Sequence, residues 1–188
     1  MLSEAKTRKK ILSNATELFA HNPYGKVTIR KIAQSANVSP SLVIYYFISK
    51  ENLYCQIFEE FFPELENMIK KLKKEPKLTL SLIVNNYIEV WRINSLIPIV
   101  IHRELLSLDN TEAKNRLANK LLIPHKKKLM SLLSSITECS PYNEGYYYML
   151  VISLSTYPFI SDHISNEQNT DMSFLQNVYE SVLPQAVC

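Results

Sequence analysis

Residues 28 to 53 read Thr-Ile-Arg-Lys-Ile-Ala-Gln-Ser-Ala-Asn-Val-Ser-Pro-Ser-Leu-Val-Ile-Tyr-Tyr-Phe-Ile-Ser-Lys-Glu-Asn-Leu, and this stretch predicts two short helices and the start of a third. Thr28, Ser39 and Ser49 are residue types that commonly cap helix N-termini, and Pro40 stands at a first helical position, where its missing N–H costs nothing. The helix that begins after Ser39 must be short because the next one begins at Ser49. Two short helices in this order are typical of a helix-turn-helix, which places its second helix in a groove of DNA.

Asn37 lies in the turn between the two predicted helices. Such a turn usually requires a positive backbone φ, which Gly adopts freely and Asn adopts more readily than most other residues. We therefore expect a positive φ at Asn37.

The N-terminal region resembles the DNA-binding domain of TetR-family transcriptional regulators over roughly residues 5 to 55. The residues in the family's order and spacing are Arg8, Ile11, Leu12, Ala15, Leu18, Phe19, Thr28, Ile32, Ala33, Ala36, Val38, Ser39, Tyr45, Tyr46, Phe47, Ser49, Lys50, Glu51 and Leu53. Two positions depart from the family pattern. Asn37 stands where the family has Gly, and Ile44 stands where it often has an aromatic residue.

A double-stranded DNA operator is the partner that this resemblance implies. By resemblance, the candidate phosphate contacts are Thr28, Tyr45, Tyr46 and Lys50. Arg30 is the candidate for base reading, because a guanidinium can bond guanine through two hydrogen bonds. The leading end of the second helix consists of Ser39, Pro40, Ser41 and Leu42. These side chains have few donors, so we expect them to read thymine methyl groups and groove shape in a palindrome that contains A·T pairs.

An all-α fold is favoured by a chain of 188 residues that is 46% apolar and has only two Gly. We predict an N-terminal three-helix helix-turn-helix DNA-binding domain over residues 1–50 and a C-terminal helical ligand-binding and dimerisation domain over residues 51–188. Apolar periodicity and Pro positions predict helices over about 49–72 with a kink at Pro63, 78–94, 98–108, 111–122, 124–137, 140–159 and 171–183.

Positive charge is concentrated near the predicted helix-turn-helix. Eight Lys or Arg and three Glu precede residue 54, a net charge of +5, whereas the whole chain has +3 and the remainder therefore −2. A basic head on a slightly acidic body favours binding to DNA.

Other classes of protein find little support in the sequence. No apolar run is long enough to span a membrane, and the N-terminus lacks the apolar core of a signal peptide, so we expect a cytoplasmic protein. The three Cys are far apart and fit no disulfide or metal framework. The four His form no i, i+4 pair, and two Gly cannot build a phosphate-binding loop. We expect no enzyme activity, no metal and no cofactor.

A homodimer is implied by the family resemblance, because one helix-turn-helix covers only one operator half-site. Apolar and aromatic stripes on the last two predicted helices are the candidate interface: Tyr142, Tyr146, Met149, Leu150, Ser153, Tyr157, Phe174, Leu175, Val178 and Val182. The same stripes could instead belong to the core of one chain.

The family's usual mechanism implies a ligand pocket in the body of the protein. The candidate ligand contacts are Tyr87, Trp91, His102, Arg103, Glu104, Ile123 and Phe159. Their aromatic and aliphatic character would suit a hydrophobic effector. Trp91 could equally be a core residue, and residues 102–104 could form a buried polar cluster, a salt bridge or a solvent-facing surface.

Three regulatory alternatives stay open at this point. The protein could be a ligand-responsive repressor, a constitutive DNA-binding protein, or one regulated by a protein partner. An activator is also compatible, because the position of the operator decides between activation and repression.

Overall fold

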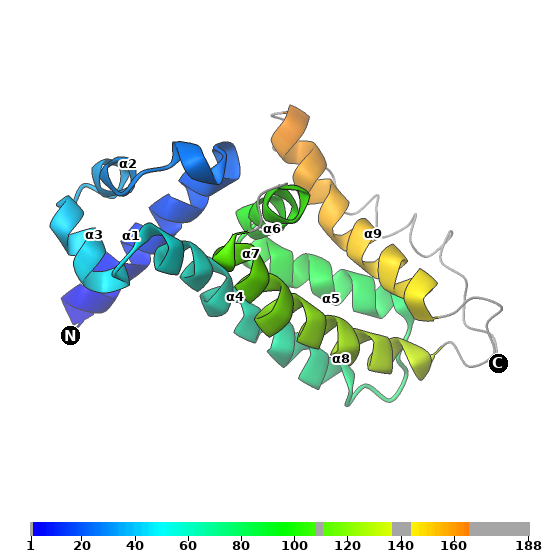
Figure 1. Ribbon diagram of the computed structural model, residues 1–188. Coiled ribbons are helices and arrows are strands. Elements are labelled where there is room, and N and C mark those ends of the chain that lie inside the picture. The colour runs from blue at the N-terminus through cyan, green and yellow to red at the C-terminus, as the bar shows by residue number, and fades with distance from the viewer. Residues whose placement is uncertain (1, 108–110, 137–143, 166–188) are drawn as a thin grey trace. The chain divides into compact units, whose positions relative to one another are not determined.

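The computed structural model describes residues 2–107, 111–136 and 144–165, and within these ranges the regular structure is entirely helical (Figure 1). The N-terminal elements are α1 (Leu2–His21), the 3₁₀ turn η1 (Tyr24–Lys26), α2 (Ile29–Ser35), α3 (Pro40–Phe47) and α4 (Lys50–Leu72). They are followed by α5 (Leu80–Ile93), α6 (Leu96–Leu106), α7 (Glu112–Arg116), the π-helical segment η2 (Leu117–Leu122), α8 (Ile123–Ser134) and α9 (Glu144–Ser165). The predicted all-α class is confirmed.

The three predicted helix starts are present, each with the expected side-chain cap. The Thr28 hydroxyl accepts a hydrogen bond from the Lys31 N–H at 3.2 Å, and the Ser39 hydroxyl accepts one from the Leu42 N–H at 3.2 Å. The Ser49 hydroxyl accepts the Asn52 N–H at 3.0 Å. Each cap satisfies one of the N–H groups that a helix start leaves without a partner.

Asn37 has a φ of 50°, as predicted. The N–H of Val38 donates to the Ala33 carbonyl at 2.9 Å, and the N–H of Asn37 donates to the Gln34 carbonyl at 3.1 Å. This is the Schellman pattern that closes a helix C-terminus with one left-handed residue. The turn between α2 and α3 is thus determined by Asn37.

Several predicted boundaries in the body are corrected. Helix α6 begins at Leu96, because the Asn94 side chain accepts the Leu96 N–H and Pro98 fits within the first turn. Pro124 does not interrupt the helical path, since the π-helical segment before it accommodates the missing N–H. Helix α9 continues through Pro158 to Ser165, beyond the end predicted near residue 159.

Two compact units divide the chain, and each is formed from two segments. The first combines Met1–Phe62 with Ile99–Leu121, and the second combines Pro63–Pro98 with Leu122–Cys188. These packing units differ from the predicted division at residue 50, because most of α6 packs with the N-terminal helices. Helices α4 and α6 are each continuous across a unit boundary. The functional boundary at residue 50 stays a prediction.

Each unit has its own apolar core. In the first unit the fully buried side chains include Ile11, Phe19, Ile32, Val43, Phe47 and Leu53. In the second unit α5 and α8 both pack against α9, and the buried side chains include Ile69, Ile83, Val84, Leu133 and Val151 (Figure 1). No helix within the described ranges is both long and apolar enough to cross a membrane.

Candidate nucleic-acid interface

Helices α2 and α3 pack on each other to form the helix-turn-helix. Val43 and Phe47 of α3 and Ile32 and Ala33 of α2 are buried between them and the rest of the first unit. The opposite face of α3 is exposed, and Tyr45 on that face is 72% accessible to solvent. A helix that is anchored on one side and bare on the other has the geometry needed to enter a major groove.

All nine candidate DNA contacts lie in one short part of the first unit, between the start of α2 and the start of α4. The exposed ones are Thr28, Arg30, Ser39, Pro40, Ser41 and Tyr45, and the half-buried ones are Leu42, Tyr46 and Lys50. The capping hydroxyls of Thr28 and Ser39 accept hydrogen bonds from the chain, so each O–H remains able to donate to a phosphate. Contact between these side chains and DNA stays a prediction.

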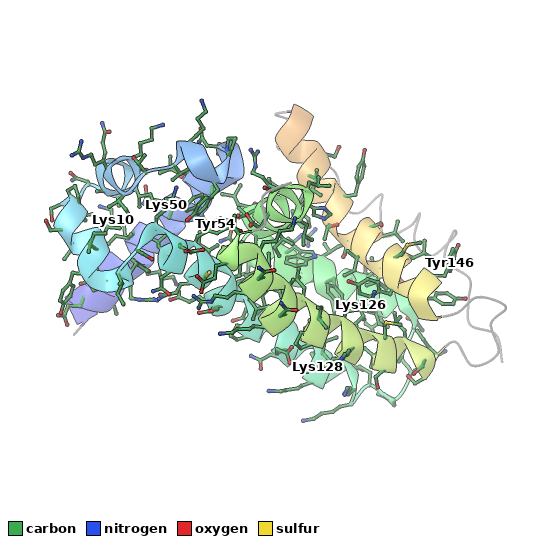
Figure 2. The ribbon with its side chains drawn as sticks, in the orientation of Figure 1. Lys10, Lys50, Tyr54, Lys126, Lys128 and Tyr146 are labelled. Atoms are coloured by element: carbon green, nitrogen blue, oxygen red, sulfur yellow. The ribbon has the colours of Figure 1, made fainter. Side chains whose placement is uncertain are left out.

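The ammonium group of Lys50 holds the turn that precedes α2. It donates hydrogen bonds of 3.1 Å to the carbonyls of Tyr24 and Val27, and it lies 3.9 Å from the centre of the Tyr24 ring (Figure 2 labels Lys50). Burial lowers the pKa of the Lys50 ammonium. Because an ammonium has three N–H donors, one stays available for a phosphate oxygen. The sequence resemblance indicated a DNA contact here but not this internal role.

Arg8 connects three helices of the first unit. Its guanidinium lies 5.1 Å from the centre of the Phe47 ring, at the end of α3, and it also bonds the side chains of Gln56 and Glu60 on α4. These contacts orient the end of α3 relative to α1 and α4. No local sequence pattern predicts them, because the partners are 39 to 52 positions away.

Glu104 and Arg103, two of the candidate ligand contacts, bond to other residues of the first unit. The buried Glu104 carboxylate accepts hydrogen bonds from the hydroxyls of Tyr54, at 2.9 Å, and Thr111, at 2.8 Å. The Arg103 guanidinium donates to the Ala20 carbonyl at 2.9 Å, near the end of α1. Of the alternatives that the sequence left open for residues 102–104, the structure therefore shows a buried polar cluster around Glu104. It joins α6 to α4 and α1.

Four of the five remaining candidate ligand contacts lie in the second unit: Tyr87, Trp91, Ile123 and Phe159. Tyr87, Trp91 and Phe159 are buried, whereas Ile123 is largely exposed. His102, by contrast, belongs to the first unit, and burial lowers the pKa of its imidazole. The structure therefore brings only part of the predicted set together, and their ligand contacts stay a prediction.

A polar chain that the sequence did not indicate crosses the second unit. The Tyr87 hydroxyl lies 2.7 Å from Nε2 of His125, and Nδ1 of His125 lies 3.7 Å from Oε1 of Glu66, which also bonds Lys128. Burial lowers the pKa of His125, although Glu66 opposes this effect. Burial alone would raise the pKa of Glu66, but the hydrogen bond from Lys128 and the attraction of both basic groups keep it below its usual value.

The described residues contain no cluster of three metal-ligating side chains.

The part of the predicted dimer interface that can be placed lies on α9. Tyr146, Met149, Ser153 and Tyr157 are exposed and Leu150 is half-buried (Figure 2 labels Tyr146). Tyr142 and the last predicted helix, with Phe174, Leu175, Val178 and Val182, lie outside the described residues. The interface itself stays a prediction.

Residues 11–57 match the family model described as bacterial regulatory proteins, tetR family. The negative transcriptional regulator IcaR of the biofilm operon icaADBC of Staphylococcus aureus is 36% identical over 62 residues, which are 33% of this chain and 33% of IcaR. The match thus spans about a third of the length of this curated relative.

Solved structures of similar fold cover nearly the whole chain. FadR of Bacillus subtilis, a transcriptional regulator crystallised with stearoyl-CoA, aligns with a TM-score of 0.69 and 20% identity over 96% of this chain and 99% of its own. NalD, the secondary repressor of the MexAB-OprM multidrug efflux pump of Pseudomonas aeruginosa, aligns with a TM-score of 0.67 and 16% identity over 96% of this chain and 95% of its own. These alignments show that the chain shares the fold of both proteins.

Proposed function

We propose that this chain, whose residues 11–57 match the tetR family of bacterial regulatory proteins, is a transcriptional repressor that binds a palindromic operator as a homodimer and is released by a small hydrophobic effector. The observation that carries the proposal is the complete helix-turn-helix, with both short helices capped and the outer face of α3 exposed. Repression is favoured over activation because IcaR, which is 36% identical to this chain over 62 residues, is a negative regulator.

DNA recognition is assigned to the nine candidate residues of the helix-turn-helix. Thr28, Tyr45, Tyr46 and the free donor of Lys50 would bond phosphates and set the orientation of α3. The leading end of α3 would then meet base edges, with Arg30 on α2 as the side chain best suited to guanine. The net charge of +5 before residue 54 supplies attraction to the phosphates.

A homodimer is supported by the exposed stripe on α9. Met149 and Tyr157 are large apolar or aromatic side chains that a single chain leaves largely in solvent. Residues of this kind are enriched in the buried centres of protein interfaces. A second copy would cover them and would supply the second helix-turn-helix that a palindrome requires.

Release by an effector is supported by the continuity of α4 and α6. Both helices contribute residues to each compact unit, and within the first unit they are joined by the hydrogen bond between Tyr54 and Glu104. A ligand that favours one arrangement of the second unit could therefore shift the helix-turn-helix, provided that it binds the DNA-incompetent state more tightly. A hydrophobic effector suits the largely apolar interior that contains Tyr87, Trp91 and Phe159.

The test is fluorescence-anisotropy binding to duplex DNA from immediately upstream of the gene, compared with a scrambled duplex across a salt series. We expect clearly tighter binding to the upstream duplex at physiological salt. Equal and steeply salt-dependent binding to both would indicate phosphate attraction only and would contradict a specific regulator of this site.

Stearoyl-CoA, the ligand crystallised with FadR, is the first effector to add to the bound complex. DNA release at micromolar ligand would support the effector-responsive form of the proposal. Binding that persists across a panel of acyl-CoA and other hydrophobic compounds would favour a constitutive or protein-regulated DNA-binding protein.

Sedimentation that shows a monomer at micromolar concentration would contradict the homodimer.

A further inference from the structure

Ile48, between α3 and α4, has an unusual backbone conformation for its residue type. Its φ is 65° and its ψ is −49°, and the N–H of Ser49 donates to the Phe47 carbonyl at 2.6 Å across it. This is a three-residue γ-turn of the rare form with positive φ. Such a conformation is strained for any residue with a side chain and most of all for a β-branched one.

Several contacts hold the strained turn in place. The N–H of Ile48 donates to the Ile44 carbonyl at 2.7 Å and closes the end of α3. The Phe47 carbonyl accepts a second hydrogen bond, from the Asn52 side chain at 3.0 Å, and the Phe47 ring is fully buried. The surrounding structure therefore imposes the backbone conformation, and a Gly at position 48 could adopt the same turn without strain.

The Ile48 side chain gains little from the fold in return. It is 77% exposed, and two residues of the last turn of α3, Ile44 and Tyr45, are exposed as well. Ile48 follows Ile44 by four positions and Tyr45 by three. The free protein thus places a large apolar side chain in solvent on a strained backbone, beside the surface that reads DNA.

We propose that Ile48 packs against the deoxyribose rings of bound duplex DNA, an inference that rests on the proposed function. Base reading by a helix-turn-helix is concentrated at the N-terminal end of its second helix, and Ile48 lies beyond the other end. Ser49 and Lys50 follow it at the N-terminus of the 23-residue helix α4, where N–H groups and a cation attract phosphate. The deoxyribose of DNA lies between the phosphates and the bases. A side chain that lies beside phosphate-attracting groups, and away from the end of α3 that reads bases, is therefore placed to contact the sugar. The C–H groups of the deoxyribose ring suit the apolar side chain of isoleucine.

The test compares Ile48→Ala and Ile48→Gly with Ile93→Ala, which removes an exposed isoleucine of α5 in the second unit. Each dimer is titrated with the upstream duplex and with the scrambled duplex, and its thermal unfolding is followed. We expect both Ile48 variants to bind both duplexes about three- to tenfold more weakly, with the salt dependence unchanged because no charge is lost. Their unfolding temperatures should be no lower than that of the wild type, since Gly removes the strain and Ala, which is not β-branched, reduces it. Ile93→Ala should bind DNA as the wild type does.

Wild-type affinity in Ile48→Ala would overturn the proposal, and so would a loss of affinity accompanied by a lower unfolding temperature. A loss confined to Ile48→Gly would also overturn it, because backbone freedom would then be the cause. Deoxyribose is present in every duplex, so the scrambled DNA reports on Ile48 even if the wild type fails to discriminate and the proposed operator is wrong.

Discussion

The phenol of Tyr54 donates a 2.9 Å hydrogen bond to Oε2 of Glu104, which lies fifty residues further along the chain. Glu104 is only 4% exposed, and its other oxygen accepts the Thr111 hydroxyl. Burial, and then the nearby carboxylate, raise the pKa of Tyr54 far above its usual value, so the phenol stays protonated and continues to donate. The hydrogen bond joins α4, the helix that follows the helix-turn-helix, to α6.

Substituting Tyr54→Phe removes this hydrogen bond and little else. We expect the free energy of unfolding to fall by about 1–3 kcal/mol, because the buried Glu104 carboxylate loses a hydrogen-bond donor. Urea unfolding measures the change. Tyr45→Phe, at the exposed phenol of α3, is the control and should stay within about 0.5 kcal/mol of the wild type. Equal stabilities of the two variants would contradict the importance of the Tyr54 contact.

Asn37 should be replaceable by Gly but not by Ala. Its φ of 50° is accessible to Gly without a steric penalty, whereas Ala in the left-handed region is disfavoured by about 1 kcal/mol or more. Asn37→Gly is therefore expected to match or exceed the wild-type unfolding temperature, and Asn37→Ala to lower it by a few degrees. Calorimetry on the three proteins checks the order. An Ala variant as stable as the Gly variant would mean that the turn changes conformation.

Lys50 has two roles that different measurements separate. Lys50→Ala removes the hydrogen bonds to the Tyr24 and Val27 carbonyls and should lower the free energy of unfolding by about 1–3 kcal/mol. If the third donor contacts a phosphate, the same variant should bind all DNA sequences more weakly, and the slope of log affinity against log salt should fall by about one. Lys50→Arg keeps the charge and is the control for the slope. An unchanged slope in Lys50→Ala would leave Lys50 with only its internal role.

His125 should make stability depend on pH in the range below neutrality. Burial keeps the folded-state pKa of His125 below 6.5, so between the two pKa values the unfolded chain binds a proton that the folded chain does not. Stability is then retained above about pH 6.5 and lost as the pH falls below it. His125→Gln should lose less stability than the wild type between pH 7.5 and pH 5.5, as measured by urea midpoints. His102, whose pKa burial also lowers, contributes in the same direction in both proteins, so parallel curves would contradict the role of His125.

Local hydrogen bonding explains why so much of the helix-turn-helix could be predicted from sequence. The caps of Thr28, Ser39 and Ser49 each bond an N–H only three positions away, and the Asn37 turn closes within five positions. Residue type and spacing alone therefore predict these features. The strain at Ile48 could not be predicted, because Ile has no intrinsic preference for a positive φ and adopts it only where neighbouring contacts impose it.

The body of the protein was less predictable because its prolines and polar groups depend on distant partners. Pro124 was predicted to interrupt a helix, and the helix that contains Pro158 was predicted to end near residue 159. The helical path continues past both positions, since a π-helical segment accommodates Pro124 and packing of α9 on α5 and α8 supports the helix beyond Pro158. Residues 102–104 suggested a ligand site, and the partners of Arg103 and Glu104 proved to be Ala20, Tyr54 and Thr111.

The sequence by itself determined the helix starts, the turn at Asn37, the positive net charge before residue 54 and the similarity of residues 11–57 to the tetR family. Only the tertiary structure decided which polar groups meet: Lys50 with the turn before α2, Tyr54 with Glu104, and Tyr87 with His125. The physical reason is the range of the interactions. A cap or a turn is satisfied within a few residues, whereas a hydrogen bond between residues 23 to 50 positions apart forms only after apolar packing has brought their segments together.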